Sequence, residues 1–205
     1  MIKKITLSII LFALFTAKLH ALIEVDITRG NLDPLPVAVS PLSADKNTND
    51  KLSKELKIEK IGHKISEVVE NNLKNSGLFN PLNKDAFLQK PDIAHLKPRF
   101  EDWSLIKAQA LITGKVTLND EKLRVEFRLW DVLAGKEMMA LAFTTVPSNW
   151  RRVGHIITDK VYERLTGEKG YFDTRIIYVA EEGPKTKRIK KLAIMDQDGS
   201  NTKYL

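Results

Sequence analysis

Residues 149–166 show the clearest helical pattern in the chain. Their apolar side chains recur at steps of three and four residues, on one face of an α-helix: Trp150, Val153, Ile157, Val161 and Leu165. Ser148 is suited to cap the start of this helix, and Gly167 is suited to end it in a left-handed conformation. The pattern therefore predicts an amphipathic helix with defined ends.

A second amphipathic helix is predicted over residues 52–75. Its apolar stripe consists of Ile58, Ile61, Ile65, Val68, Val69 and Leu73. Ser76 and Gly77 follow the stripe and are expected to end the helix. Further along, Asp102 is placed to cap a short helix that begins at Trp103.

Three consecutive stretches between the two long helices have the alternating pattern of β-strands. They cover residues 110–118, residues 123–130 and a segment marked by Met139, Leu141 and Phe143. In the second stretch one face is apolar and the other is mostly charged, as in a sheet that is buried on one side. With a further short apolar strand at residues 37–39, the pattern predicts a mixed sheet covered by amphipathic helices, an α/β two-layer sandwich.

The first 21 residues have the pattern of a secretory signal peptide. Lys3 and Lys4 give a positive start, residues 5–15 form an apolar run, and Ala21 is small enough for a cleavage site. We expect cleavage between Ala21 and Leu22. Because the apolar run is short for a membrane span, the mature chain is expected to be exported rather than anchored in a membrane.

The segment that follows the expected cleavage site alternates strictly between apolar and polar side chains. Ile23, Val25 and Ile27 alternate with Glu24, Asp26 and Thr28. Gly30, Pro34 and Pro36 then interrupt the pattern. The segment fits an edge strand of the domain, and it equally fits a strand that docks on a partner protein.

The chain changes character after Gly170. Residues 175–179 and 189–195 predict two strands, and residues 196–199 (Asp-Gln-Asp-Gly) predict a tight turn. A lone hairpin is only marginally stable in water. We therefore expect residues beyond about 173 to fray or to fold back on the domain.

Composition narrows the class of protein. The chain has 205 residues, of which 43% are hydrophobic and 29% charged, as in a folded soluble protein with one substantial core. It has no cysteine, which excludes disulfides and thiolate metal sites. Removing Lys3, Lys4 and Lys18 with the leader leaves 30 basic and 26 acidic side chains, a mildly basic balance that favours an anionic partner only weakly.

Candidate catalytic chemistry is sparse. His155 and Asp159 are four residues apart on one helix and so are expected to face each other, more simply as a surface hydrogen bond than as a catalytic pair. No zinc-protease, P-loop or nucleophile-elbow motif is present in the sequence. We therefore predict no catalytic, cofactor-binding or metal-binding residues.

Two further patterns are considered as binding sites. Asp196 and Asp198 partly match a calcium loop, but the glycine comes too early and no bidentate glutamate follows, so the turn interpretation is favoured. The basic run at residues 185–191 has no interleaved aromatic side chains, which argues against nucleic-acid binding.

Fragments in a characteristic order and spacing connect this sequence with a known family. They are Ser76-Gly77-Leu78-Phe79, Trp103, Thr113-Gly114, Phe127-Arg128-Leu129-Trp130-Asp131, His155, Asp159, Tyr162, Leu165-Thr166-Gly167, Phe172 and Asp196-Gln197-Asp198-Gly199. In these residues the sequence closely resembles the TolB family, periplasmic proteins of the Tol-Pal envelope system. It departs from the family where Lys107 replaces the usual glycine and Gly154 the usual alanine.

The resemblance implies a domain organisation. It implies a signal peptide at residues 1–21, a docking strand at 22–33, the amino-terminal α/β domain at 34–170, and an incomplete first blade of a β-propeller at 171–205. TolB proteins continue into the full propeller, so the chain is expected to be a truncated member.

The resemblance also implies a non-enzymatic periplasmic adaptor that supports outer-membrane integrity and envelope constriction during cell division. Family members bind the C-terminal domain of TolA through the mature N-terminal strand, here Ile23, Glu24, Val25, Asp26, Ile27 and Thr28. They bind the lipoprotein Pal through the propeller, so the Pal site is expected to be missing, and they meet the membrane only through partners. An exported hydrolase, another periplasmic binding module and a non-functional fragment remain as alternatives.

Overall fold

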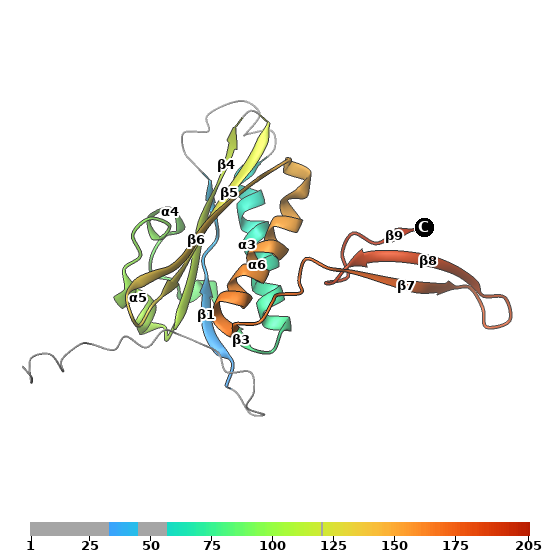
Figure 1. Ribbon diagram of the computed structural model, residues 1–205, viewed down its shortest axis with the longest axis horizontal. Coiled ribbons are helices and arrows are strands. Elements are labelled where there is room, and N and C mark those ends of the chain that lie inside the picture. Colours follow the sequence, from blue (N-terminus) through green and yellow to red (C-terminus); the bar gives the residue numbers. More distant parts are fainter. Residues whose placement is uncertain (1–32, 45–56, 120) are drawn as a thin grey trace, which may run out of the picture.

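The computed structural model describes residues 33–44, 57–119 and 121–205. A mixed sheet forms the centre of the body, with strand order β3-β1-β4-β5-β6 (Figure 1). The strands are β1 (Leu35–Val39), β3 (Phe79–Pro81), β4 (Ala110–Asn119), β5 (Lys122–Asp131) and β6 (Lys136–Thr145), and the short β2 (Ser43–Ala44) also pairs with β4. β1 runs parallel to both neighbours, whereas β4, β5 and β6 form the predicted antiparallel meander.

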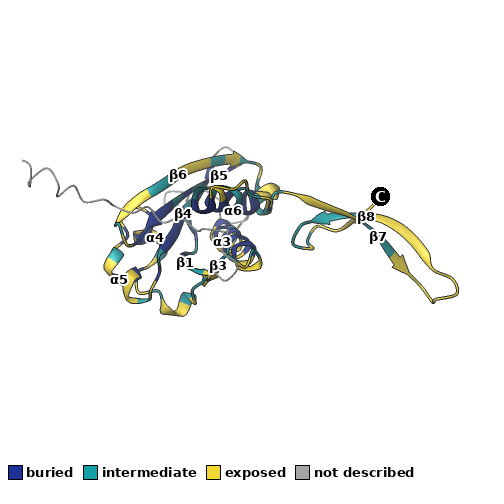
Figure 2. Cartoon of the chain, turned by 60° about the horizontal axis from the view of Figure 1, so that its bottom comes forward, coloured by how far each residue is buried: buried dark blue, intermediate teal, exposed yellow. Residues whose placement is uncertain are grey.

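Two long helices, α3 (Ile58–Asn75) and α6 (Trp150–Thr166), cover one face of this sheet (Figure 1). Their apolar stripes and the inward side chains of the strands form the main core, which is the dark layer in Figure 2. The core includes Ile65, Val69, Leu73, Ile157, Val161 and Leu165. The predicted two-layer sandwich is confirmed, although Trp150 lies at the rim of the core and is only partly buried.

The opposite face of the sheet is covered at one end by short elements: η1 (Lys84–Ala86), α4 (Pro91–Ala94) and α5 (Phe100–Leu105). A second apolar cluster forms there around Trp103 and Trp130. The indole Nε1 of Trp103 donates to Gln89 Oε1 at 3.1 Å, and that of Trp130 donates to Thr113 Oγ1 at 2.9 Å. The predicted charged outer face of β5 is therefore found at Arg124, Glu126 and Arg128, which are half-buried, and on this face only Trp130 at the end of the strand is buried.

The ends of the long helices follow the glycine prediction. Gly77 and Gly167 have φ angles of 74° and 76°, the left-handed conformation that glycine adopts without a steric penalty. The Gly167 N–H donates to the carbonyl of Glu163 at 2.9 Å, which caps α6.

The predicted helix starts are wrong. α3 begins at Ile58, after Lys57 in a left-handed conformation, and the predicted residues 52–56 lie outside the described part. Ser148 caps nothing, because it lies in the 3₁₀ turn η2 (Pro147–Asn149), which leads straight into α6. Asp102 lies inside α5, which starts at Phe100, and the Phe100 ring packs on Trp130 with ring centroids 5.9 Å apart.

A separate three-stranded antiparallel sheet follows the body. It consists of β7 (Arg175–Glu182), β8 (Ile189–Asp196) and β9 (Lys203–Tyr204), and it extends away from the helices (Figure 1). Most of its side chains are exposed (Figure 2). The expectation that these residues fray is wrong, because β7 and β8 pair along their whole length, and folding back on the domain is limited to the turn after β8, which contacts α3 and α6.

The signal peptide prediction (residues 1–21) and the docking segment 22–28 fall outside the described residues. Within the described ranges, none of the helices has the length and apolar content needed to span a membrane.

Candidate functional site

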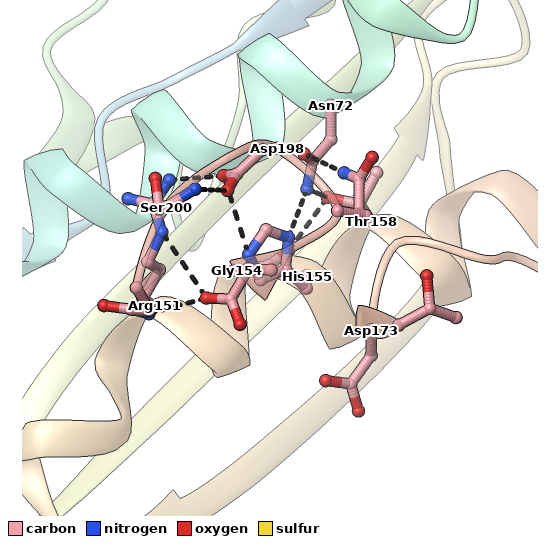
Figure 3. A network of polar contacts seen from close by, with 12 residues as sticks. Asn72, Arg151, Gly154, His155, Thr158, Asp173, Asp198 and Ser200 are labelled. Atoms are coloured by element: carbon pink, nitrogen blue, oxygen red, sulfur yellow. Dashed lines mark hydrogen bonds and ion pairs between the residues drawn. The ribbon is translucent and has the colours of Figure 1, made fainter. Parts of the chain in front are cut away.

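Polar side chains gather where the turn after β8 meets α3 and α6 (Figure 3). We call this group the helix–turn joint. It consists of Asn72 from α3, Arg151, His155 and Thr158 from α6, and Asp196, Gln197 and Asp198 from the turn. The turn is closed as predicted, since the Gly199 N–H donates to the carbonyl of Asp196 at 2.9 Å.

Asn72 is the centre of the joint. It is fully buried near the end of α3, where its Nδ2 lies 2.9 Å from His155 Nδ1 and donates to Thr158 Oγ1 at 3.2 Å. Its Oδ1 accepts from Gln197 Nε2 at 2.9 Å. A buried amide must have its donors and acceptors satisfied, and here one amide joins three segments of the chain.

His155 faces the core side of α6 and is only 2% exposed. Its Nδ1 accepts from the Asn72 amide, so in the neutral ring the hydrogen sits on Nε2. Nε2 lies 3.7 Å from Asp198 Oδ2, too far for a hydrogen bond, and has no partner among the described residues. Burial lowers the pKa of His155 despite the nearby Asp198 carboxylate, which keeps the ring neutral.

Asp198 is the acidic partner of α6. One of its oxygens pairs with the guanidinium of Arg151, and Oδ1 accepts from the Ser200 N–H at 3.1 Å. Partial burial acts to raise the pKa of Asp198, but the Ser200 hydrogen bond and the charge of Arg151 outweigh it and lower the pKa below its usual range. The carboxylate is therefore ionised in the folded chain.

Asp196 lies beside this pair. Its Oδ2 accepts from Asn201 Nδ2 at 2.5 Å and is 4.0 Å from Arg151 Nε. A cavity of about 590 Å³ adjoins these groups and is lined by side chains from α6 and the small sheet, among them Arg152, Arg175 and Lys203. The joint therefore has a route to solvent on one side.

The predicted pairing of His155 with Asp159 is wrong. Asp159 instead accepts from the Phe172 N–H at 2.7 Å and from the Asp173 N–H at 3.2 Å, which fixes the chain where it leaves the helix. His155 turns toward α3, where the Asn72 amide offers a partner in the closed core. Its Nδ1 therefore meets an amide rather than a hydroxyl, an arrangement without an activated nucleophile.

The basic run on the hairpin is largely paired with acids across β7 and β8. Arg188 and Lys190 contact Glu181, and Lys191 contacts Glu182 at 2.8 Å.

Three residues of the joint were not predicted as site residues: Asn72, Arg151 and Gln197. The one available sign was a polar Asn72 at a stripe position between Val69 and Leu73. The predicted partner segment Ile23–Thr28 and the Ala21–Leu22 cleavage site lie outside the described residues.

Comparison with known proteins places the chain in a family. The family model of the TolB amino-terminal domain matches residues 23–138. The Tol-Pal system protein TolB of Pelagibacter ubique (strain HTCC1062) is 81% identical over 196 residues, which cover 96% of this chain and 44% of that protein. The chain therefore spans less than half the length of this curated relative.

Solved structures agree at the level of the fold. The crystal structure of TolB from Acinetobacter baumannii superposes with a TM-score of 0.67 at 22% identity, covering 89% of this chain and 41% of that one. The LpoB C-terminal domain from Escherichia coli reaches a TM-score of only 0.39 at 15% identity, over 57% of this chain and 86% of that one, which is too low to carry an argument. Since the family model matches more than half of the sequence, the chain belongs to the TolB amino-terminal domain family.

Proposed function

We propose that this chain acts as a non-enzymatic periplasmic adaptor of the Tol-Pal system and binds the C-terminal domain of TolA through Ile23–Thr28. The observation that carries the proposal is the family match over residues 23–138, together with 81% identity to a Tol-Pal system protein TolB. The polar joint supports a non-enzymatic role, because the hydrogen-bond partner of its histidine among the described residues is an amide rather than a hydroxyl nucleophile. In this role the chain supports outer-membrane integrity and envelope constriction.

The position of the docking segment supports strand addition to a partner. β1 starts at Leu35 in the middle of the sheet, between β3 and β4, so the chain after Pro34 is anchored in the body. Residues 22–28 precede this anchor and alternate, which suits pairing with an exposed sheet edge. The backbone would supply hydrogen bonds, and Ile23, Val25 and Ile27 would supply specificity.

The balance of energies predicts weak binding. Burying three such apolar side chains contributes about 1.5–3 kcal/mol each. Ordering the segment costs about 1–2 kcal/mol per residue. Because these terms nearly cancel, the net affinity depends on backbone hydrogen bonds of about 0.5–1.5 kcal/mol each, and we expect a micromolar-class complex.

The test is a titration of the TolA C-terminal domain against the mature chain, Val25→Asp and a chain that starts at Pro34. Both altered chains should lose at least about tenfold in affinity, since each removes an apolar anchor or the whole strand. Val179→Asp, at an exposed position of β7, is the matched control and should bind like the wild type. Equal binding by all four proteins would contradict the proposal.

Pal provides a second arm of the same experiment. The family resemblance assigns Pal binding to the β-propeller, and this chain covers 44% of its curated relative. We expect a polypeptide of these 205 residues to capture no Pal at micromolar concentration. Robust capture would show that the amino-terminal domain carries a Pal site of its own.

A further inference from the structure

We propose that the helix–turn joint binds a divalent transition-metal ion, with Zn²⁺ as the best match. The ligands are His155 Nε2 and one carboxylate oxygen each from Asp196 and Asp198. These three atoms lie within 4.8 Å of one another. One imidazole nitrogen and two carboxylate oxygens form a donor set that suits zinc and its neighbours, with a further position left for water.

The imidazole carries the argument, because His155 Nε2 is buried and has no hydrogen-bond partner in the described part of the chain. A buried polar atom without a partner calls for a physical explanation. His155 Nε2 lies 3.7 Å from Asp198 Oδ2. Two ligands that bind one tetrahedral zinc at about 2.0–2.1 Å lie about 3.4 Å apart, so the spacing fits a shared ion better than a direct hydrogen bond.

Arg151 is the competing cation. Its Nη2 pairs with Asp198, but its Nε is buried, has no hydrogen-bond partner among the residues that the structure describes, and lies 4.0 Å from Asp196 Oδ2. The guanidinium therefore pairs closely with Asp198 and only distantly with Asp196, whose Oδ2 accepts from Asn201 and whose Oδ1 lies 4.0 Å from Arg175 Nε. The cavity of about 590 Å³ beside it offers the arginine an alternative position when a metal takes its place.

The surroundings of His155 can support a metal ligand. A ligating imidazole donates its other N–H to an acceptor, which fixes the ring. Asn72 can supply that acceptor if its amide turns over, because Oδ1 then faces His155 Nδ1, and the Thr158 hydroxyl then donates to Oδ1 instead of to the Gly154 carbonyl. Gln197 turns over with it and accepts from the Asn72 amide, so the contact between the turn and α3 is kept. Neither change alters the shape of the side chains.

A bound ion would join the two parts of the molecule. Asp196 is the last residue of β8 and Asp198 lies in the turn between β8 and β9, whereas His155 belongs to α6 of the body. The metal would therefore cross-link the sheet to the body, in place of the close ion pair that Arg151 makes with Asp198.

The experiment is a titration of the full mature chain with ZnCl₂, monitored by calorimetry. A parallel titration with Co²⁺ in place of zinc is monitored by its visible absorption. We expect one site per chain. Changes in outer-shell partners cost metal sites about 10–100-fold in affinity, so His155→Gln and Asp198→Asn, which remove ligands, should cost at least that much. Arg151→Gln removes the competing charge and should tighten binding by about tenfold, which is about 1.4 kcal/mol.

His63→Gln, on the exposed face of α3, is the matched control and should leave the affinity unchanged. If His155→Gln does not fold, the opposite effects of Asp198→Asn and Arg151→Gln still decide the question. Zinc binding that survives Asp198→Asn, or that is not tightened by Arg151→Gln, overturns the proposal. So does the absence of binding to the wild type at millimolar Zn²⁺.

Discussion

Lys107 occupies a backbone conformation that side chains rarely adopt. Its φ angle is 63°, and its N–H donates to the Ser104 carbonyl at the end of α5. A non-glycine residue in this region costs about 1–3 kcal/mol. In the TolB family, according to the resemblance, the position of Lys107 is usually occupied by glycine.

We therefore expect Lys107→Gly to stabilise the fold, by about 0.5–1 kcal/mol once the larger entropy of unfolded glycine is subtracted. Urea unfolding measures the change in the free energy of unfolding. Lys107→Ala keeps the strained conformation and is the control, with no expected gain. A glycine variant that is no more stable than the alanine variant would show that this turn is not strained.

His95 is a second buried residue whose surroundings affect its protonation. Its ring is only 3% exposed, and both ring nitrogens are without hydrogen-bond partners among the described residues. Burial lowers the pKa of His95, the positive charges of Arg128 and Lys115 lower it further, and Glu126 opposes them. The folded chain therefore resists protonation of this ring.

The sign of the pH effect follows. In the unfolded chain this histidine titrates near pH 6.5, so below that pH the unfolded state binds more protons than the folded state. The free energy of unfolding should fall as pH drops from about 7.5 to about 5.5. His95→Leu should reduce this fall but not abolish it, because the pKa of buried His155 is lowered too. The check is urea unfolding at both pH values, with His63→Gln as a control that keeps the wild-type fall.

At the scale of elements, α3 and α6 approach each other closely at Gly154. A Cβ atom there would lie 2.8 Å from Val68 Cγ1 and 2.9 Å from Val68 Cβ. Alanine would gain at most about 1 kcal/mol in helix propensity. Overpacking a close contact costs about 1–3 kcal/mol, so we expect Gly154→Ala to destabilise the fold.

A double-mutant cycle tests the reason for this loss. Val68→Ala removes Cγ1 but keeps Cβ, so adding Gly154→Ala to that variant should cost less than in the wild type, with a residual cost from the Cβ contact at 2.9 Å. Thermal or urea unfolding of the four proteins gives the coupling energy. Strict additivity would mean that the helices separate to accept the methyl group.

At the scale of the whole molecule, the body extends as far as Phe172. This ring is buried in the main core, 5.7 Å from Tyr162, and Asp159 holds its backbone N–H. The small sheet beyond it touches the body mainly through the helix–turn joint (Figure 3). A chain of residues 22–173 should therefore fold by itself.

A chain of residues 22–170 should be less stable, because it lacks the buried ring. Deleting a buried phenylalanine side chain costs about 3–5 kcal/mol. Phe172→Ala in the full chain is the matched variant and should lose a similar amount in thermal unfolding followed by circular dichroism. Equal stability of the two shortened chains would show that the core does not depend on Phe172.

Sequence periodicity by itself determined the main elements. The meander of β4, β5 and β6, the two long helices and their glycine ends follow from patterns within each segment. Such patterns fix which side chains share a face, because spacing along a regular backbone determines direction. The family resemblance came from the same local fragments. Helix starts were less predictable, since Ser148 and Asp102 were equally compatible with positions inside a turn or a helix.

Only the tertiary structure decided which polar groups meet. Asn72 and Gln197 are 125 residues apart, and no local pattern connects them. His155 lies at the edge of an apolar stripe, so periodicity could place it either toward Asp159 or toward α3. The packing of α3 on α6 closed that side from water, and burial then required a partner from the neighbouring helix. The helix–turn joint follows from this packing, because hydrogen-bond partners in a core are chosen by proximity in space.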